Sequence, residues 1–387
     1  MAKRALFHPP RIREDELGGT HRPVTWIELF FDLFVVVVLA RLAHELGEGH
    51  FAPQSLTAFF GAFVPLFWLW VGAAYYIERF ETAGLEFRLI MLGFMAAVTG
   101  LGAFSHHAMT DHFAGYAGVY AAGRAFTASL WFRAAFHNPP GVARAARTLA
   151  AGTVLGAAIM AASILLHGPL RYGVFTIGLT WDIIAPRLHA SAQAAFPPVS
   201  TSKYPERFGL FTIIALGECA AGLIGGLGNA AHPDWLAGGL CLLLAFGLWW
   251  IYFDFVGRRK FRQSAAQILA WVYAHIGLFA AIAIAGAAMR EVLMLAPHAT
   301  EALGVAVAVF LALVAVIETL LARQPGEPAH PVASPAVKLA AGAAAAMAGI
   351  FIHSSQVVLA LLCVCLLVPM LYGLWVWHTT EIIEDHH

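Results

Sequence analysis

The sequence predicts an all-α, polytopic bundle of about twelve transmembrane helices. Sixty per cent of its 387 residues are hydrophobic and only 12% are charged, whereas a soluble domain is typically about 25% charged. Apolar runs of about 20 residues, the length of a helix that crosses a bilayer, recur along almost the whole chain. The basic residues stand in short clusters between those runs, as they do in the loops of membrane proteins.

The expected spans follow one another, separated by polar, proline or glycine breaks. They cover residues 24–46, 56–78, 87–108, 113–135, 146–167, 170–190, 206–228, 235–256, 266–289, 302–322, 336–353 and 355–378. Residues 1–23 form a polar tail that lacks the apolar core and cleavage site of a signal peptide, and residues 379–387 form a second tail. We therefore expect one membrane domain over residues 24–378, in which the first span is its own uncleaved insertion signal.

The distribution of Lys and Arg predicts the orientation of these spans. If the N-terminus is cytoplasmic, all but four of the 23 Lys and Arg residues fall in cytoplasmic segments. The four exceptions are Arg41, Arg124, Arg171 and Arg290. An excess of basic residues in the inner loops is the rule for membrane proteins, so we expect both tails to be cytoplasmic.

Two parallel repeats of six helices, residues 24–190 and 204–378, are one interpretation of short internal similarities. The first span opens with Glu28 followed by aromatic residues, and the seventh opens with Glu206 followed by aromatic residues. Parallel repeats of this kind are related by an axis along the membrane normal. Interfacial anchoring by aromatic residues explains the same similarities without a repeat, and both interpretations stay open.

Ionisable residues inside the spans are the candidate functional residues. A charge near the bilayer centre costs roughly 2.5–3.5 kcal/mol on insertion scales, so each one needs a partner or a function. The sequence places Asp32 in the first span, Arg124 in the fourth, Asp182 in the sixth, Glu218 in the seventh and His275 in the ninth. We expect these residues to form a polar site near the midplane, in which Arg124 pairs with Asp182 or Glu218.

A proline interrupts the sixth span. Pro186 follows Asp182 by four residues and therefore removes the helical hydrogen bond to the Asp182 carbonyl. An interrupted helix beside an acid is a common way to build an ion or substrate site in a transporter. An ordinary proline kink is the alternative.

A second set of acids lies at the cytoplasmic ends of the expected spans: Glu28, Glu78, Glu206 and Asp254. Glu28 also completes a capping-box pattern that begins at Thr25, in which its carboxylate would satisfy a free backbone N–H group, and we favour that structural interpretation for it. No cofactor motif is recognisable, and the four cysteines fall in apolar runs, where cysteine behaves as a small hydrophobe. We expect no cofactor, and leave open whether a metal binds.

Five segments carry a family resemblance: TWIELFFDLFVV at 25–36, ERFET at 78–82, ERFGLFTIIALGE at 206–218, WWIYFD at 249–254 and YAH at 273–275. The sequence resembles the bacterial low-temperature-requirement A (LtrA) family in these segments. It departs from the family pattern where Ala83 and Gly84 replace further acids, and where Lys203 replaces a common histidine. The resemblance implies a multi-pass protein of the bacterial inner membrane, connected with growth in the cold, but it implies no defined molecular activity.

The function that the buried residues favour is transport or channelling of a small solute or ion, coupled to protons. Titratable groups at membrane depth are typical of transporters and pumps. In this hypothesis Glu218 or Asp182 carries the proton, Arg124 is its charge partner, and His275 is a relay.

Two other functions stay open. The first is an intramembrane enzyme that acts on a lipid or isoprenoid, with the four cytoplasmic-edge acids as general acids, bases or metal ligands. The second is a non-catalytic membrane scaffold or stress protein. The expected partners are the lipid bilayer and the small solute or ion, and a homo-oligomer is compatible with the sequence. The net charge of zero gives no general attraction to nucleic acid.

Overall fold

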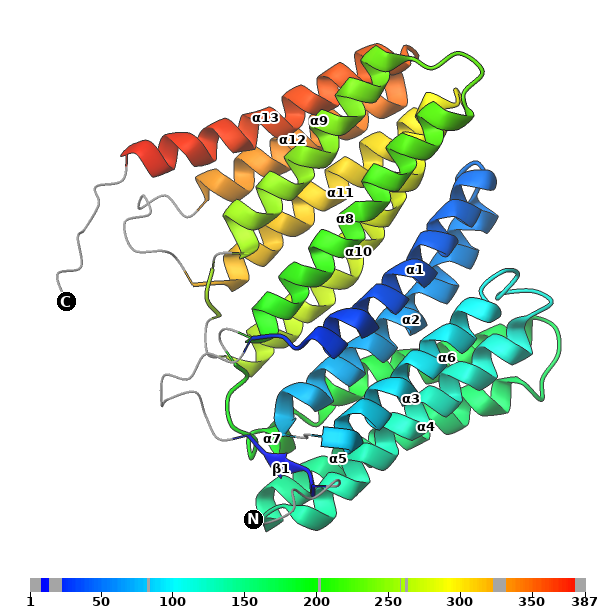
Figure 1. Ribbon diagram of the computed structural model, residues 1–387, viewed down its shortest axis with the longest axis vertical. Helices are drawn as coiled ribbons and strands as arrows, with labels where there is room; N and C mark the ends of the chain where they lie inside the picture. The colour runs from blue at the N-terminus through cyan, green and yellow to red at the C-terminus, as the bar shows by residue number, and fades with distance from the viewer. Residues whose placement is uncertain are drawn as a thin grey trace. The chain divides into compact units, whose positions relative to one another are not determined.

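The computed structural model describes residues 8–13, 23–81, 84–200, 203–257, 259–261, 264–322 and 332–379. The chain is all-helical, as the sequence predicts: it is 83% helix, with thirteen α-helices in its described part (Figure 1). Two strands of two residues each accompany them, β1 (Arg11–Ile12) and β2 (Phe80–Glu81).

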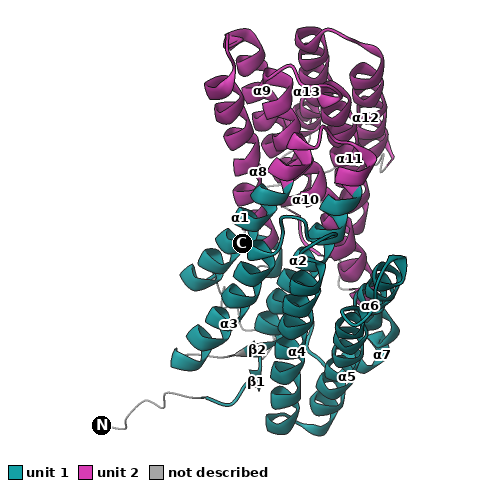
Figure 2. Cartoon of the chain, turned by 90° about the vertical axis from the view of Figure 1, so that its right-hand side faces the viewer, with its two compact units in different colours: residues 1–42, 57–207 teal, residues 43–56, 208–387 magenta. Residues whose placement is uncertain are grey.

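The chain divides into two compact units (Figure 2). Unit 1 comprises residues 1–42 and 57–207, and unit 2 comprises residues 43–56 and 208–387. The helices are α1 (Trp26–Glu48), α2 (Pro53–Arg79), α3 (Gly84–Ala103), α4 (Phe113–His137), α5 (Pro140–Ser163), α6 (Pro169–Leu188), α7 (Ala190–Gln193), α8 (Lys203–Asn229), α9 (Trp235–Tyr252), α10 (Ala265–Leu293), α11 (Ala299–Leu320), α12 (Ala333–Phe351) and α13 (Ser355–Thr379). A π-helical segment, Phe253–Gly257, continues α9.

All the described helices except α7 are long, and each overlaps one of the expected spans. The largest difference at a helix start concerns α5, which begins at Pro140 rather than at residue 146. Proline fits the first turn of a helix, because an N–H group there would have no helical partner. The expected boundary at residue 146 is therefore wrong, and the Pro139-Pro140 pair was the signal that marked the true start.

By length and apolar composition, nine of the described helices are able to cross a membrane: α2, α3, α5 and α8–α13. The other long helices, α1, α4 and α6, carry Asp32, Arg124 and Asp182, which are all buried. These charges make the three helices less apolar than a simple span. Composition thus supports nine spans where the sequence interpretation expected about twelve.

Unit 1 is held together by sequential helix packing and by the N-terminal strand. Helix α4 packs against α3 and α5, and α5 also packs against α6. Strand β1 pairs antiparallel with β2. Asn138, which follows α4, accepts a hydrogen bond from the Ile12 N–H at 2.9 Å and donates one to the Pro10 carbonyl at 2.7 Å. Residues 10–12 are therefore attached to the ends of α2 and α4. The sequence predicted only a polar tail here and did not predict this contact.

Unit 2 contains a second set of packed helices. Helix α11 packs against α10 and α12, and α13 packs against α9 and α12. Asp234 caps α9 by accepting a hydrogen bond from the Ala237 N–H at 3.0 Å, and it accepts another from Gln356 at the start of α13 at 2.7 Å. The hydrogen bond from Ala237 lowers the pKa of Asp234 below its usual value, because it stabilises the carboxylate.

Small residues allow α11 and α12 to approach closely. A Cβ at Gly304 would lie 2.7 Å from the Ala345 carbonyl oxygen and 2.9 Å from the Gly349 Cα. Two helix backbones reach such a distance only where side chains are absent, and small residues have this role in membrane helix packing.

Replacing Gly304 with alanine should lower the free energy of unfolding by about 1–3 kcal/mol, because the added methyl group would overpack the contact with α12. Gly239→Ala on α9 is the matched control: no atom lies within 4 Å of its Cβ position, and alanine favours a helix over glycine by up to about 1 kcal/mol. Thermal unfolding of the purified protein in detergent measures both. Equal melting temperatures for the two variants would contradict the close approach of α11 and α12.

Candidate functional site

A group of four buried charges joins α1 to the first turns of α8 in unit 1. Lys203 Nζ lies 2.9 Å from Glu28 Oε1, Arg207 Nη2 lies 3.0 Å from Asp32 Oδ1, and Arg207 Nη1 lies 3.6 Å from Glu28 Oε2. None of the four residues is more than 4% exposed. The residue pairs 28/32 and 203/207 are each four positions apart, so each pair lies on one face of its helix. Two acids thus meet two bases, and the group carries no net charge.

The aromatic residues around this group complete its contacts. Trp70 on α2 donates an indole hydrogen bond to Asp32 Oδ1 at 2.6 Å. The Arg207 guanidinium lies 5.7 Å from the centre of the Trp70 ring and 5.9 Å from that of Phe31, within the range of cation–π attraction. Asp32 therefore has a counter-charge and a hydrogen-bond donor, as a buried carboxylate requires.

The structure corrects the interpretation of Glu28. The capping-box pattern predicted that its carboxylate would satisfy a free backbone N–H group, but both carboxylate oxygens face Lys203 and Arg207 instead. The ammonium group of Lys203 neutralises Glu28. The pattern was wrong because a local motif cannot reveal a cation that arrives from another helix.

A second buried pair links α4 to α6. Arg124 Nη2 donates a hydrogen bond to Asp182 Oδ1 at 2.7 Å, and Arg124 Nε lies 2.7 Å from Asp182 Oδ2 in the same ion pair. Tyr120 donates a hydrogen bond to Asp182 Oδ2 at 3.0 Å. The Arg124 guanidinium also lies against Gly72, where a Cβ would collide with Nη1. Of the two acids expected to pair with Arg124, the partner is Asp182 and not Glu218.

Pro186 leaves the Asp182 carbonyl without a helical donor, and a side chain of α2 donates to it instead. The Trp68 indole donates a hydrogen bond to the Asp182 carbonyl at 3.2 Å. Trp68 and Trp70 stand two positions apart on α2, and they donate to Asp182 and Asp32 respectively. Helix α2 therefore contributes to both buried groups of unit 1.

Glu218 differs from Asp32 and Asp182 in having no charged partner in the part of the chain that the structure describes. It lies near the middle of α8, in unit 2, and is partly buried. Within the described ranges of the chain, its carboxylate makes no hydrogen bond or ion pair. The neighbouring Gly217 has no atom within 4 Å of the position of a Cβ, so the space beside the helix at this level is open.

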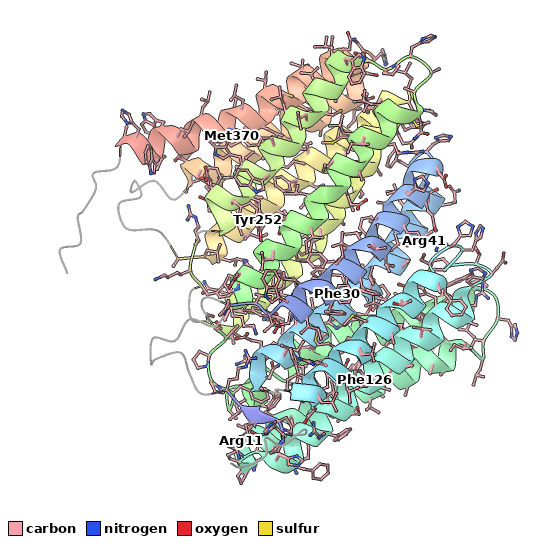
Figure 3. The ribbon with its side chains drawn as sticks, viewed as in Figure 1. Arg11, Phe30, Arg41, Phe126, Tyr252 and Met370 are labelled. Atoms are coloured by element: carbon pink, nitrogen blue, oxygen red, sulfur yellow. The ribbon has the colours of Figure 1, made fainter. Side chains whose placement is uncertain are left out.

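His275 in unit 2 is fully buried in an aromatic environment. Its Nδ1 lies 2.8 Å from the Trp271 carbonyl, and its Nε2 lies 3.2 Å from the hydroxyl of Tyr252, labelled in Figure 3 at the end of α9. Because a carbonyl only accepts, Nδ1 carries the hydrogen and Nε2 accepts from the tyrosine. Phe208 and Phe279 pack on the same ring. This arrangement holds a neutral imidazole in one orientation.

The four acids that the sequence places at the cytoplasmic edge are distributed over both units. Glu28, Glu78 and Glu206 belong to unit 1, and Asp254 belongs to unit 2. Glu78 accepts a hydrogen bond from the Ser200 N–H at 2.9 Å, and Asp254 accepts one from the Trp250 indole at 2.5 Å. Among the residues that the structure describes, no group of three or more His, Cys, Asp and Glu side chains is placed to hold a metal ion.

The sequence interpretation missed a further buried charge group in unit 2. Glu318 near the end of α11 accepts from Arg259 Nη2 at 3.0 Å and from Lys338 Nζ at 2.8 Å, and Ser334 donates to the same carboxylate. Glu318 and Lys338 are buried. The available signal was an acid in the last turn of a strongly apolar span, together with a lysine inside the next one.

The Trp68 hydrogen bond is testable by a double-mutant cycle. Trp68→Phe should cost about 1–3 kcal/mol of stability, because it leaves the Asp182 carbonyl buried without a donor. Pro186→Ala restores the backbone N–H that donates to this carbonyl in a regular helix, so Pro186→Ala should recover part of the loss when combined with Trp68→Phe. Thermal unfolding of the four proteins gives the coupling. If the two substitutions have additive effects on stability, the Trp68 indole and the backbone N–H at position 186 do not share the Asp182 carbonyl as acceptor.

The Arg207 pairing is testable in the same way. Arg207→Met should cost about 3–5 kcal/mol, since it leaves Asp32 buried without a counter-charge. Asp32→Asn removes that charge and keeps an acceptor for Trp70, so the double variant should be more stable than Arg207→Met alone. Arg88→Met, at an exposed arginine of α3, is the control and should have little effect. A double variant no more stable than Arg207→Met would refute the pairing.

Comparison with known proteins agrees with the motifs in the sequence. Residues 23–372 match the family model described as bacterial low temperature requirement A protein (LtrA). No curated protein and no solved structure matches the chain. The match covers nearly the whole chain, including both units and all the buried groups described above. This protein, with its many apolar membrane-capable helices, therefore belongs to the LtrA family.

Proposed function

We propose that this chain is a transporter or channel for a small solute or ion in the bacterial inner membrane, coupled to protons through Glu218. The observation that carries the proposal is the position of Glu218: a carboxyl group in the middle of an apolar helix that has no ionic partner among the described residues. A membrane acid at such depth is expected to have a function when no counter-charge explains it.

The contrast with the paired acids supports Glu218 as the proton carrier. Protonation of Asp32 or Asp182 would leave Arg207 or Arg124 as a buried cation with a weakened partner, which is strongly unfavourable. Glu218 gains or loses a proton without breaking an ion pair. Of the two acids that the sequence offers as proton carrier, Glu218 and Asp182, we therefore propose Glu218.

In this proposal the other expected site residues position the helices. The Arg124–Asp182 pair joins α4 to α6, and the Asp32–Arg207 pair joins α1 to the start of α8. Trp68 and Trp70 attach α2 to both acids. His275 keeps a fixed orientation because both its nitrogens are engaged, which favours a positioning role over a relay.

The proposal includes twelve spans with both termini in the cytoplasm. Within the described residues, composition alone supports nine spans, and α1, α4 and α6 complete the twelve if paired charges are tolerated in the membrane. Their buried charges have ionic partners inside unit 1, and pairing is what permits such charges in transmembrane helices. The proposal also includes the parallel repeat of six helices.

The experiment is a proton and ion flux assay in proteoliposomes, with a pH-sensitive dye inside and a panel of salts outside. Glu218→Gln should abolish proton-coupled flux, because the amide cannot carry a proton. Glu301→Gln is the matched control: it makes the same chemical change at an exposed position at the start of α11, and it should retain full flux.

Two outcomes would count against the proposal. Flux that is the same in wild type and Glu218→Gln would exclude Glu218 as the carrier. A folded wild-type protein with no flux under any salt would favour the intramembrane enzyme, and a search for a lipid modified by the protein would then follow.

A further inference from the structure

An open, groove-like cavity of about 470 Å³ lies along the start of α5 and the end of α6 in unit 1. Arg144 and Arg147 form its polar end at the start of α5, Ala151, Leu155 and Trp181 form its apolar end, and His189 lies beside Gly152 between them. The charge networks described above do not use any of these side chains. The two ends differ in chemistry, which indicates an amphipathic ligand.

The polar end is basic, and no acid is among the described residues that line the cavity. Arg144 and Arg147 are exposed, and they make no ion pair with any residue in the described part of the chain. Helix α5 contains no Asp or Glu, and the acid of α6, Asp182, is already paired with Arg124. Arg144 and Arg147 are three positions apart and lie on one face of α5. Two guanidinium groups side by side favour a phosphate, which they bind through charge-assisted hydrogen bonds.

A histidine adds a third polar group. His189 follows α6, and its Nδ1 is buried without a hydrogen-bond partner within the described chain. The same atom lies 3.6 Å from the position that a Cβ of Gly152 would take, and Gly152 also lines the cavity. The missing side chain at this position thus leaves room for the imidazole at the edge of the cavity.

The apolar end continues from the basic end along the membrane-spanning part of α5. Leu155 lies eleven residues beyond Arg144, which corresponds to about 16 Å along a helix. Leu155 is 47% exposed, and Trp181 forms a fixed wall because its indole donates a hydrogen bond to the Gly152 carbonyl at 2.9 Å. The length and polarity of this surface fit a headgroup at the helix ends and an acyl chain along the helices.

We propose that this cavity binds a glycerophospholipid with a negatively charged headgroup. The phosphate lies against Arg144 and Arg147, and an acyl chain lies along Ala151, Leu155 and Trp181. Basic pockets between transmembrane helices bind the headgroups of anionic lipids in this way. The lipid is favoured over free phosphate because the apolar end of the cavity would otherwise stay unoccupied. This inference does not depend on the transport activity proposed above.

The test measures lipid binding by native mass spectrometry of the full-length protein in detergent. Phosphatidylglycerol and phosphatidylcholine with the same acyl chains are titrated separately, and inorganic phosphate is titrated in a third series. Wild type should bind phosphatidylglycerol more tightly than phosphatidylcholine. Arg144→Gln combined with Arg147→Gln should weaken phosphatidylglycerol binding about tenfold or more, since each basic residue near a lipid headgroup contributes roughly a fivefold increase in affinity.

The matched control is Arg11→Gln combined with Arg88→Gln, which removes two exposed arginines elsewhere in unit 1 and should keep the phosphatidylglycerol preference. All these arginines are exposed, so both double variants should fold, and size-exclusion chromatography checks that they do. An unchanged preference in the first double variant, or an equal loss in the control, would overturn the proposal. Phosphate binding that depends on Arg144 and Arg147 without any lipid preference would identify a free-phosphate site and overturn the lipid assignment.

Discussion

The ion pair between Arg207 and Asp32 is the contact on which the arrangement of unit 1 depends. It completes a neutral group with Glu28 and Lys203, and it brings the start of α8 against α1. Buried ion pairs are not in themselves a strong source of stability, because desolvation offsets their attraction. Removing one charge of the group, however, would leave an opposite charge buried without a partner, which is strongly destabilising. The Arg124–Asp182 ion pair imposes the same condition on α4 and α6.

The length of the apolar runs was sufficient to predict the positions of the long helices, because membrane thickness fixes how many apolar residues a span needs. The need for a partner to Arg124 was also predictable, because an unpaired guanidinium is unfavourable in a membrane. The choice between Asp182 and Glu218 was not predictable, since it depends on which helices are adjacent. In the same way, Pro186 showed that the Asp182 carbonyl would lose its donor, but the replacement donor, Trp68, is 114 residues away.

Glu28 and Glu318 show where local patterns mislead. The surroundings of Glu28 match a helix cap, yet its partner Lys203 is 175 residues away. Glu318 stands in the last turn of a span, where an acid is easily taken for the beginning of a loop, yet it is buried against Lys338. In the sequence, a carboxylate at the end of a span fits a local role, as a cap or the start of a loop, as well as it fits a buried ion pair. Only the position of a distant basic residue distinguishes them.

Helix α8 combines both kinds of ionisable group found in this chain. Its first turns carry Lys203 and Arg207, whose charges are held by the acids of α1. Glu218 follows Arg207 by eleven residues, about 16 Å along the helix, and has no such partner within the described residues. A change in the protonation of Glu218 therefore alters one charge on a helix whose other end is fixed by ion pairs. Such a separation allows the proposed proton carrier to titrate while the paired groups that stabilise the fold stay intact.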